Sequence, residues 1–188
     1  MLTTEFLLAW FLVMFPLVYS PGPANTLFAS NGAQFGLRRS MPFLTGIDIA
    51  FVAQSLLVGF GLSGVLVAFP WLLTVFRYAG IAYIAYLGCL FLRAAMKENA
   101  PRPHCLSFRD GLVVTALNPK AWMMQIMMFS QFFDAGNAVL SIVNLTFLLS
   151  ILNISGHVVW IMFGALLLGR ATHRFSQSRQ NLFFSLML

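Results

Sequence analysis

The chain has 188 residues, of which 60% are hydrophobic and 9% are charged, and its mean hydropathy is +0.85. A soluble domain carries about 25% charged residues, so this composition excludes an ordinary soluble protein and predicts an integral membrane protein. The net charge of +6 comes from basic residues scattered over short loops, which argues against a nucleic-acid partner. We expect a single all-α transmembrane domain over residues 1–188, surrounded by the lipid bilayer.

The first apolar stretch, from Phe6 to Leu37, is too long for one straight span. As a continuous helix it would measure about 48 Å, whereas the hydrocarbon core of a bilayer is about 30 Å thick. A proline-rich motif interrupts it: Ser20-Pro21-Gly22-Pro23-Ala24-Asn25. Because the prolines remove backbone donors and disfavour helical geometry before them, we predict a break between helices over 4–19 and 24–35.

A break at membrane depth has two interpretations. Broken backbone is tolerated in a bilayer only where protein or a water-filled cavity satisfies the freed polar groups, and in transporters such breaks tend to form the binding site. The alternative is a proline kink that binds no ligand.

The rest of the chain predicts further spans in order. Four apolar segments follow the first, separated by turns or polar loops: 40–69, 71–92, 111–133 and 138–169. The longest hydrophilic loop is 93–110, and the final stretch, 181–188, has the character of a sixth span that is too short to cross. We therefore expect a helical bundle of five full transmembrane segments plus an incomplete sixth.

The basic residues predict the orientation. Nine of the eleven lie in the loops after the first, third and fifth segments: Arg38, Arg39, Arg93, Lys97, Arg102, Arg109, Arg170, Arg174 and Arg179. Short loops rich in lysine and arginine face the cytoplasm, so we expect the N-terminus outside.

Two helix breaks at corresponding places indicate an internal repeat. The fourth segment contains Asn118-Pro119-Lys120, which matches the proline break of the first segment. Paired interruptions of this kind are typical of transporters built from inverted repeats, and they lie beside the binding site. We expect repeat one over about 1–97 and a truncated repeat two over about 111–188, joined by the cytoplasmic loop at about 93–110.

Three charged residues remain inside predicted spans. Asp48 and Lys120 both lie about 14–15 Å from the cytoplasmic end of their segments, at 1.5 Å per residue. Their equal depth allows an ion pair that locks two helices, or two poles for a zwitterionic substrate. A charge at mid-span costs about 2.5–3.5 kcal/mol or more, which favours a functional role. For Arg77, near the outer surface, snorkelling to the interface is the favoured interpretation.

Other polar residues in the spans indicate packing. Asp48, Ser55 and Gly59 share one helical face, and small residues at this spacing allow membrane helices to approach closely. Asp48 is therefore expected to face the bundle rather than lipid. For His157, alone in the fifth segment, a hydrogen-bonded packing role is favoured over a proton relay.

Enzyme signatures are missing from the sequence. It has no second acid spaced with Asp48, no histidine pair at zinc spacing, no nucleophile with a nearby base and no phosphate-binding loop. We therefore expect neither an enzyme nor a metal or cofactor.

Three motifs carry a resemblance to a known family. They are Ser20-Pro21-Gly22-Pro23-Ala24-Asn25, Gly80-Ile81-Ala82-Tyr83-Ile84-Ala85-Tyr86-Leu87-Gly88 and Leu117-Asn118-Pro119-Lys120-Ala121-Trp122. In order and spacing they resemble those of the LysE/RhtB amino-acid exporters, over essentially the whole chain. The resemblance implies a bacterial inner-membrane protein that exports amino acids or related metabolites by proton antiport. The Asn-Pro-Lys-Ala-Trp version is most similar to the branch that exports cysteine and O-acetylserine.

The chain departs from the family pattern in two places. Many members carry an acid or a histidine around the positions of Phe51 and Gln54, whereas this chain has Asp48. Members also complete a sixth span. Two rival interpretations stay open: a truncated, transport-inactive member or partner subunit, and a passive channel. The sequence also leaves open assembly as a homo-oligomer.

The expected substrate site lies between the two broken helices. Its residues are Pro21, Gly22, Pro23, Asn25, Asp48, Asn118, Pro119 and Lys120. Freed amides at the breaks and the charge of Lys120 suit a substrate carboxylate. Asp48 suits a substrate ammonium or a coupling proton, and the two asparagines are expected to be uncharged hydrogen-bond partners.

Overall fold

The computed structural model describes residues 3–62 and 104–168, together with a few single positions between 69 and 89, and its regular structure there is helical. The main helices are α1 (Thr4–Tyr19), α2 (Pro23–Leu57), α5 (Phe108–Leu117), α6 (Pro119–Phe132) and α7 (Ala138–Phe163). Short π-helical turns follow α2 at Val58–Leu62 and α7 at Gly164–Leu168, and a 3-10 turn, Ala135–Asn137, precedes α7.

Several predictions fall outside these residues. The third segment with Arg77, most of the loop before His104 and everything after Leu168 are among them. The number of spans, the incomplete sixth span and the repeat boundaries therefore stay predictions.

The first helix has the predicted bounds. Its start is capped by Thr3, whose hydroxyl accepts a hydrogen bond from the N–H of Phe6 at 3.2 Å. It ends at Tyr19, and Ser20 is extended, with φ −63° and ψ 148°. The next helix begins with Pro23 in its first turn, where the missing N–H has no intrahelical partner to lose. The predicted break is confirmed.

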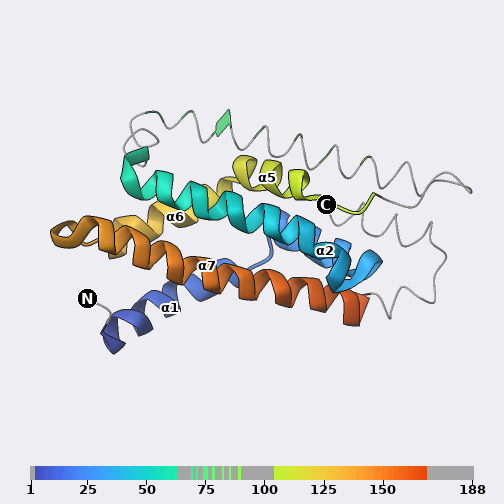
Figure 1. Cartoon of the computed structure of the whole chain (residues 1–188), viewed down its shortest axis with the longest axis horizontal. Helices are drawn as coiled ribbons and strands as arrows, with labels where there is room; N and C mark the ends of the chain where they lie inside the picture. Colours follow the sequence, from blue (N-terminus) through green and yellow to red (C-terminus); the bar gives the residue numbers. More distant parts are fainter. Residues whose placement is uncertain are drawn as a thin grey trace, which may run out of the picture.

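Gly36 divides α2 into two arms. Its φ of 73° and ψ of 176° lie in a region that favours glycine, and the chain changes direction there. The hydroxyl of Ser40 donates to the Gly36 carbonyl at 2.9 Å and accepts from the side-chain amide of Asn31 at 2.9 Å. The first arm (23–35) and the second arm (37–57) therefore form a tight helical hairpin, and the second arm runs back along the molecule (Figure 1).

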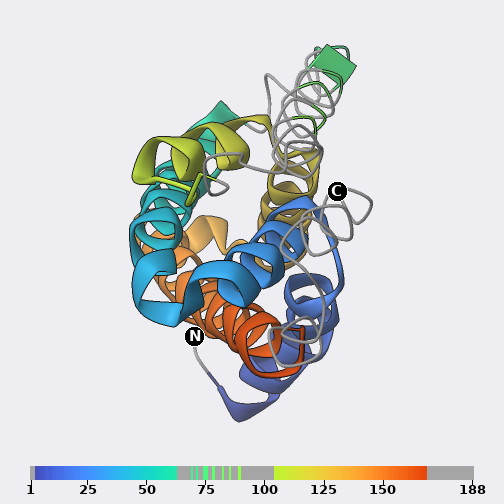
Figure 2. The same cartoon turned by 90° about the vertical axis from the view of Figure 1, so that its right-hand side faces the viewer.

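The described helices run along the long axis in alternating directions. In Figure 1, α1 and α7 run one way, while the second arm of α2 and the α5–α6 pair run the other way. Figure 2, seen along this axis, shows the helices arranged around a common centre. The hairpin at Gly36, the segment before α5 and the end of α7 share one end, whereas the start of α1, the end of α2 and the turn before α7 share the other.

The shared end with Gly36 is tied together by hydrogen bonds. The side-chain oxygen of Asn31, a fully buried residue, accepts from the N–H of Leu106 at 3.1 Å. The thiol of Cys105 donates to the carbonyl of Arg39 at 3.3 Å. The basic residues Arg39 and Arg109, which flank these contacts in sequence, therefore belong to one end of the bundle.

Many large apolar side chains of the described helices are exposed on the outside, and several uncharged polar side chains are buried, as expected in lipid. Leu12 of α1 and Phe147 of α7 are each 63% exposed, whereas Gln125 is fully buried. Two helical stretches are long and apolar enough to cross a membrane by length and composition: Pro23–Gly61 with 39 residues, which the turn at Gly36 divides into two arms, and Ala135–Leu166 with 32. This distribution agrees with the predicted membrane protein.

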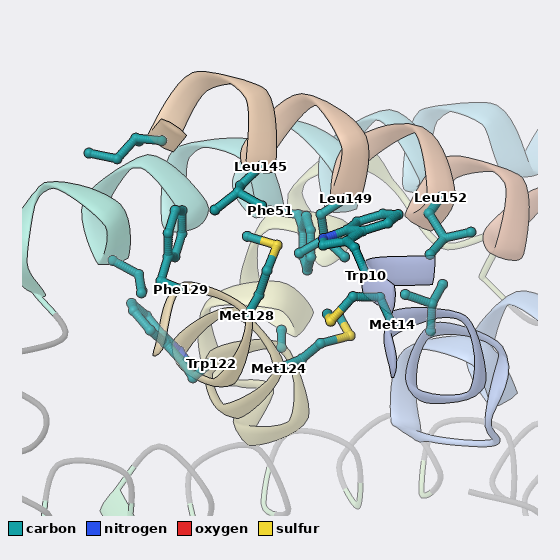
Figure 3. Close-up of a cluster of buried hydrophobic side chains, with 14 residues drawn as sticks. Trp10, Met14, Phe51, Trp122, Met124, Met128, Phe129, Leu145, Leu149 and Leu152 are labelled. Carbon is teal, nitrogen blue, oxygen red and sulfur yellow. The ribbon is translucent and has the colours of Figure 1, made fainter. Parts of the chain in front are cut away.

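Two kinds of packing hold the helices together. In one apolar cluster, side chains of α1, α6 and α7 converge, among them Met14, Met128 and Leu149 (Figure 3). Between the second arm of α2 and α5, the backbones themselves touch, because a Cβ on Gly46 would overlap the carbonyl oxygen of Phe108.

Candidate functional site

The two helix breaks face one small cavity. It has a volume of about 30 Å³, room for about two waters, and all five main helices contribute to its lining. Its polar side chains are those of Asn25, Thr115, Asn118, Lys120, Asn153 and His157. Its apolar side includes Val18, Ile47, Phe51 and Met124. The first turns of α2 and α6 both lie on its wall, so the positive ends of two helix dipoles meet there.

Asn25 closes the first break. Its side-chain amide nitrogen donates to the carbonyls of Val18 and Ser20, each at 2.9 Å. These carbonyls lack their usual helical donors because the helix ends at Tyr19 and Ser20 is extended. We predicted Asn25 as a substrate partner; the structure instead shows its amide nitrogen engaged by the backbone of the break.

Asn118 organises the second break in the same way. Its side-chain oxygen accepts from the N–H of Lys120 at 3.1 Å, which caps α6, and Pro119 occupies the first helical position. The indole N–H of Trp122 donates to the carbonyl of Ala116 at 2.9 Å, at the end of α5. The break predicted here is also confirmed, and its polar groups are satisfied locally.

Lys120 joins one break to the other. Its ammonium donates to the carbonyl of Ser20 at 2.8 Å and to the Ser20 hydroxyl at 2.9 Å. The lysine stem passes directly over Gly22, where an added Cβ would lie 3.0 Å from the lysine Cδ. Pro21 thus lies between two residues that contact Lys120. Two of the three ammonium protons are used, so one is left for a ligand in the cavity.

Asp48 lies beside α7 and is paired there. Its Oδ1 accepts from Nδ1 of His157 at 3.0 Å and from the side-chain amide of Asn153 at 3.3 Å. Its other oxygen, Oδ2, is buried and has no hydrogen-bond partner in the described part of the chain. The ring of His157 also packs against that of Phe28, with ring centroids 4.4 Å apart and the planes tilted by 35°.

The ion pair considered between Asp48 and Lys120 is not formed. Within residues 3–62 and 104–168, the acid–base pair within 4.0 Å is Asp48 with His157. Asp48 is also absent from the cavity wall, where His157 and Asn153 stand in front of it. The structure therefore brings Lys120 to the cavity directly and Asp48 only through its two partners on α7.

Sequence reasoning missed Asn153 as a site residue and favoured a packing role for His157. Both lie on one face of α7, four residues apart, in an otherwise apolar helix. Two polar residues at this spacing indicate a shared polar site, because polar groups are costly to bury in a bilayer. The predicted face of Asp48, Ser55 and Gly59 does meet α7, where the Ser55 hydroxyl lies 3.0 Å from that of Thr146.

The apolar exterior of the described helices and the helix breaks are typical of a polytopic membrane protein. A family model described as the LysE type translocator matches residues 15–188, and the chain belongs to this family. The family consists of translocators, which places the chain among transport proteins rather than enzymes.

Named relatives support this placement. A cysteine/O-acetylserine efflux protein of Escherichia coli is 28% identical over 151 residues, which cover 78% of this chain and 76% of the relative. Uncharacterized membrane proteins of Vibrio cholerae and Pseudomonas aeruginosa are 28% and 30% identical over 65% and 63% of this chain. The chain spans about three fifths of these two relatives, 61% and 59%. No solved structure matches the chain.

Proposed function

We propose that the protein is a secondary transporter that exports small amino acids or related metabolites across the bacterial inner membrane in exchange for protons. The observation that carries this proposal is the cavity between the two breaks, with Lys120 on one side and the Asp48–His157–Asn153 group on the other. The two sides have opposite electrostatic character, as the two ends of a zwitterion require.

The carboxylate of the substrate belongs beside Lys120. One proton of its ammonium is free, and the first turn of α2 presents N–H groups that lack intrahelical acceptors, whereas those of α6 are bonded to Asn118. Fixed donors of this kind bind a carboxylate without reorganising. In this proposal Gly22 and Asn118 shape the wall around the carboxylate rather than bind it with their side chains.

The wall that would receive the substrate side chain is mainly apolar, and the cavity, with room for about two waters, must widen to admit the substrate. Phe51 and Met124 lie on the wall, and the sulfur-containing methionine is adaptable in shape. The charged groups in and behind the described wall are already assigned to the two ends of the zwitterion, so a substrate with a charged side chain would find no partner. The relative named as a cysteine/O-acetylserine efflux protein supports substrates of this size and charge.

The orientation follows from the end of the bundle at which the basic residues lie. Arg38 and Arg39 at the Gly36 hairpin share that end with Arg109, so we place this end in the cytoplasm and the N-terminus outside. A reporter domain fused at Gly136 should report a position outside the inner membrane, and a reporter domain fused after Arg39 should report a position in the cytoplasm. Reversed activities would contradict the orientation.

Export is tested directly by efflux. Cells that lack their own exporters are loaded with labelled O-acetyl-L-serine or L-cysteine and diluted into fresh medium, with and without the protein. The expected result is faster loss of label, slowed when the proton gradient is collapsed. Equal efflux with and without the protein would refute the proposed transport of these substrates. Efflux that ignores the gradient would indicate a passive channel instead.

A further inference from the structure

The hydrogen bond between Asp48 and His157 fixes which ring nitrogen of the histidine carries a proton. A carboxylate can only accept, so the contact at 3.0 Å requires a hydrogen on Nδ1 of His157. The neutral ring then carries its lone pair on Nε2. Asn153 reinforces the arrangement by donating to the same oxygen of Asp48 at 3.3 Å.

His157, rather than Asp48, meets the contents of the cavity. His157 and Asn153 line the wall, whereas Asp48 lies behind them with Oδ2 sealed from solvent. Nε2 of His157 has no hydrogen-bond partner among residues 3–62 and 104–168. The side-chain oxygen of Asn153 is likewise unpaired there, while its amide nitrogen faces Asp48. Two acceptors next to the cavity are thus backed by one buried negative charge.

We propose that a proton and the ammonium group of the substrate compete for Nε2 of His157, with Asp48 as the positioning residue behind it. This inference rests on the proposed function and assigns the exchange to one atom. When Nε2 is protonated, the imidazolium and Asp48 form a neutral pair. When a zwitterion enters, that proton leaves Nε2 for water, and Nε2 and the Asn153 oxygen accept N–H groups of the ammonium. No covalent bond of the substrate changes, and one proton is released for each zwitterion bound.

The surroundings favour this competition over joint binding. Lys120 of α6 already places one positive charge on the cavity wall, so an imidazolium and an ammonium together would leave two further positive charges near a single carboxylate. From α1, the hydroxyl of Tyr19 is engaged with Ser155 at 2.9 Å. From α5, the hydroxyl of Thr115 donates to the carbonyl of Ile47 at 3.3 Å. Neither replaces Asp48 as a counter-charge.

Proton release on binding distinguishes this role from simple packing against Phe28. Purified protein in weakly buffered detergent is mixed with O-acetyl-L-serine at several values between about pH 5 and 8. A pH-sensitive dye reports released protons, and labelled O-acetyl-L-serine reports binding. The wild type should release up to about one proton per bound molecule and bind more weakly as the pH falls.

Two variants complete the test. His157→Asn keeps an amide N–H near the position of Nδ1 but cannot be protonated, so it should bind without releasing protons and with little dependence on pH. Ser155→Ala is the matched control: this residue lies two positions from His157, contacts Tyr19 and is outside the cavity wall, so the variant should release protons like the wild type. If His157→Asn does not elute as a single species in gel filtration, His157→Gln takes its place.

The outcomes separate this inference from the proposed function. Binding by the wild type without proton release, or undiminished release from the His157 variant, would overturn the competition at Nε2 while leaving amino-acid transport intact. Failure of the wild type to bind or transport O-acetyl-L-serine and L-cysteine would instead contradict the proposed function, and this inference with it.

Discussion

Replacing Lys120 by methionine separates the structural role of its ammonium from its role toward the substrate. The wild-type ammonium makes two hydrogen bonds to Ser20, at 2.8 and 2.9 Å. The Ser20 carbonyl keeps a second donor, the amide of Asn25 at 2.9 Å, so the break does not lose its last partner. A hydrogen bond to a charged group contributes about 1.5–3 kcal/mol, and we expect a stability loss of that order. This corresponds to a melting temperature about 3–12 °C lower.

The same substitution should affect transport more strongly. The substrate carboxylate loses one charge-assisted hydrogen bond, again about 1.5–3 kcal/mol, which raises KM about 10- to 150-fold. The assay is initial efflux of labelled O-acetyl-L-serine from proteoliposomes over a range of internal concentrations. As a matched control, Ser20→Ala removes only the hydroxyl partner, so it should cost about 1 kcal/mol of stability and leave KM within about twofold. A Lys120→Met protein with the KM of the wild type would refute the assignment of the carboxylate to this residue.

Three further predictions concern other parts of the structure. Replacing Pro21 and Pro23 by alanine should join α1 to α2 as one helix and abolish efflux while the protein still accumulates in the membrane. Retained efflux would show that the break is a proline kink with no role in transport. Gly46→Val should lower the melting temperature, since overpacking against the Phe108 carbonyl costs about 1–3 kcal/mol; an unchanged temperature would contradict this close approach. Burial raises the pKa of the Cys105 thiol, so its labelling by a maleimide should require a higher pH than that of an exposed cysteine. In a Cys89→Ser background, a membrane-impermeant maleimide should label Cys105 only from the cytoplasmic side, and labelling from outside would contradict the proposed orientation.

Local backbone chemistry was the part of the fold that could be predicted from the sequence. The break after Tyr19 follows from two prolines and a glycine, and the break at Asn118 follows from the same rule. Gly36 marks a change of direction because only glycine adopts its backbone angles without strain. These features depend on a few neighbouring residues, so the sequence is sufficient to locate them.

Partners distant in the chain were harder to predict. Counting residues from the basic loops gives the depth of Asp48 and of Lys120 along the bundle, but not the direction in which each side chain points. The structure pairs Asp48 with His157, 109 residues away, and Lys120 with Ser20, 100 residues away. Which helices become neighbours depends on close backbone approaches such as that of Gly46 to Phe108, and a single sequence does not specify these contacts.

The charges around the cavity have an electrical consequence. In the described part of the chain, one lysine on the wall and one aspartate behind His157 balance each other, so the deprotonated, empty site is neutral. It stays neutral with a zwitterion bound and becomes positive by one unit with a proton bound. Each cycle of the proposed exchange therefore carries one positive charge into the cell. The membrane potential, inside negative, would add about 2.3 kcal/mol per 100 mV to the driving force, so export would continue even where the pH is equal on both sides.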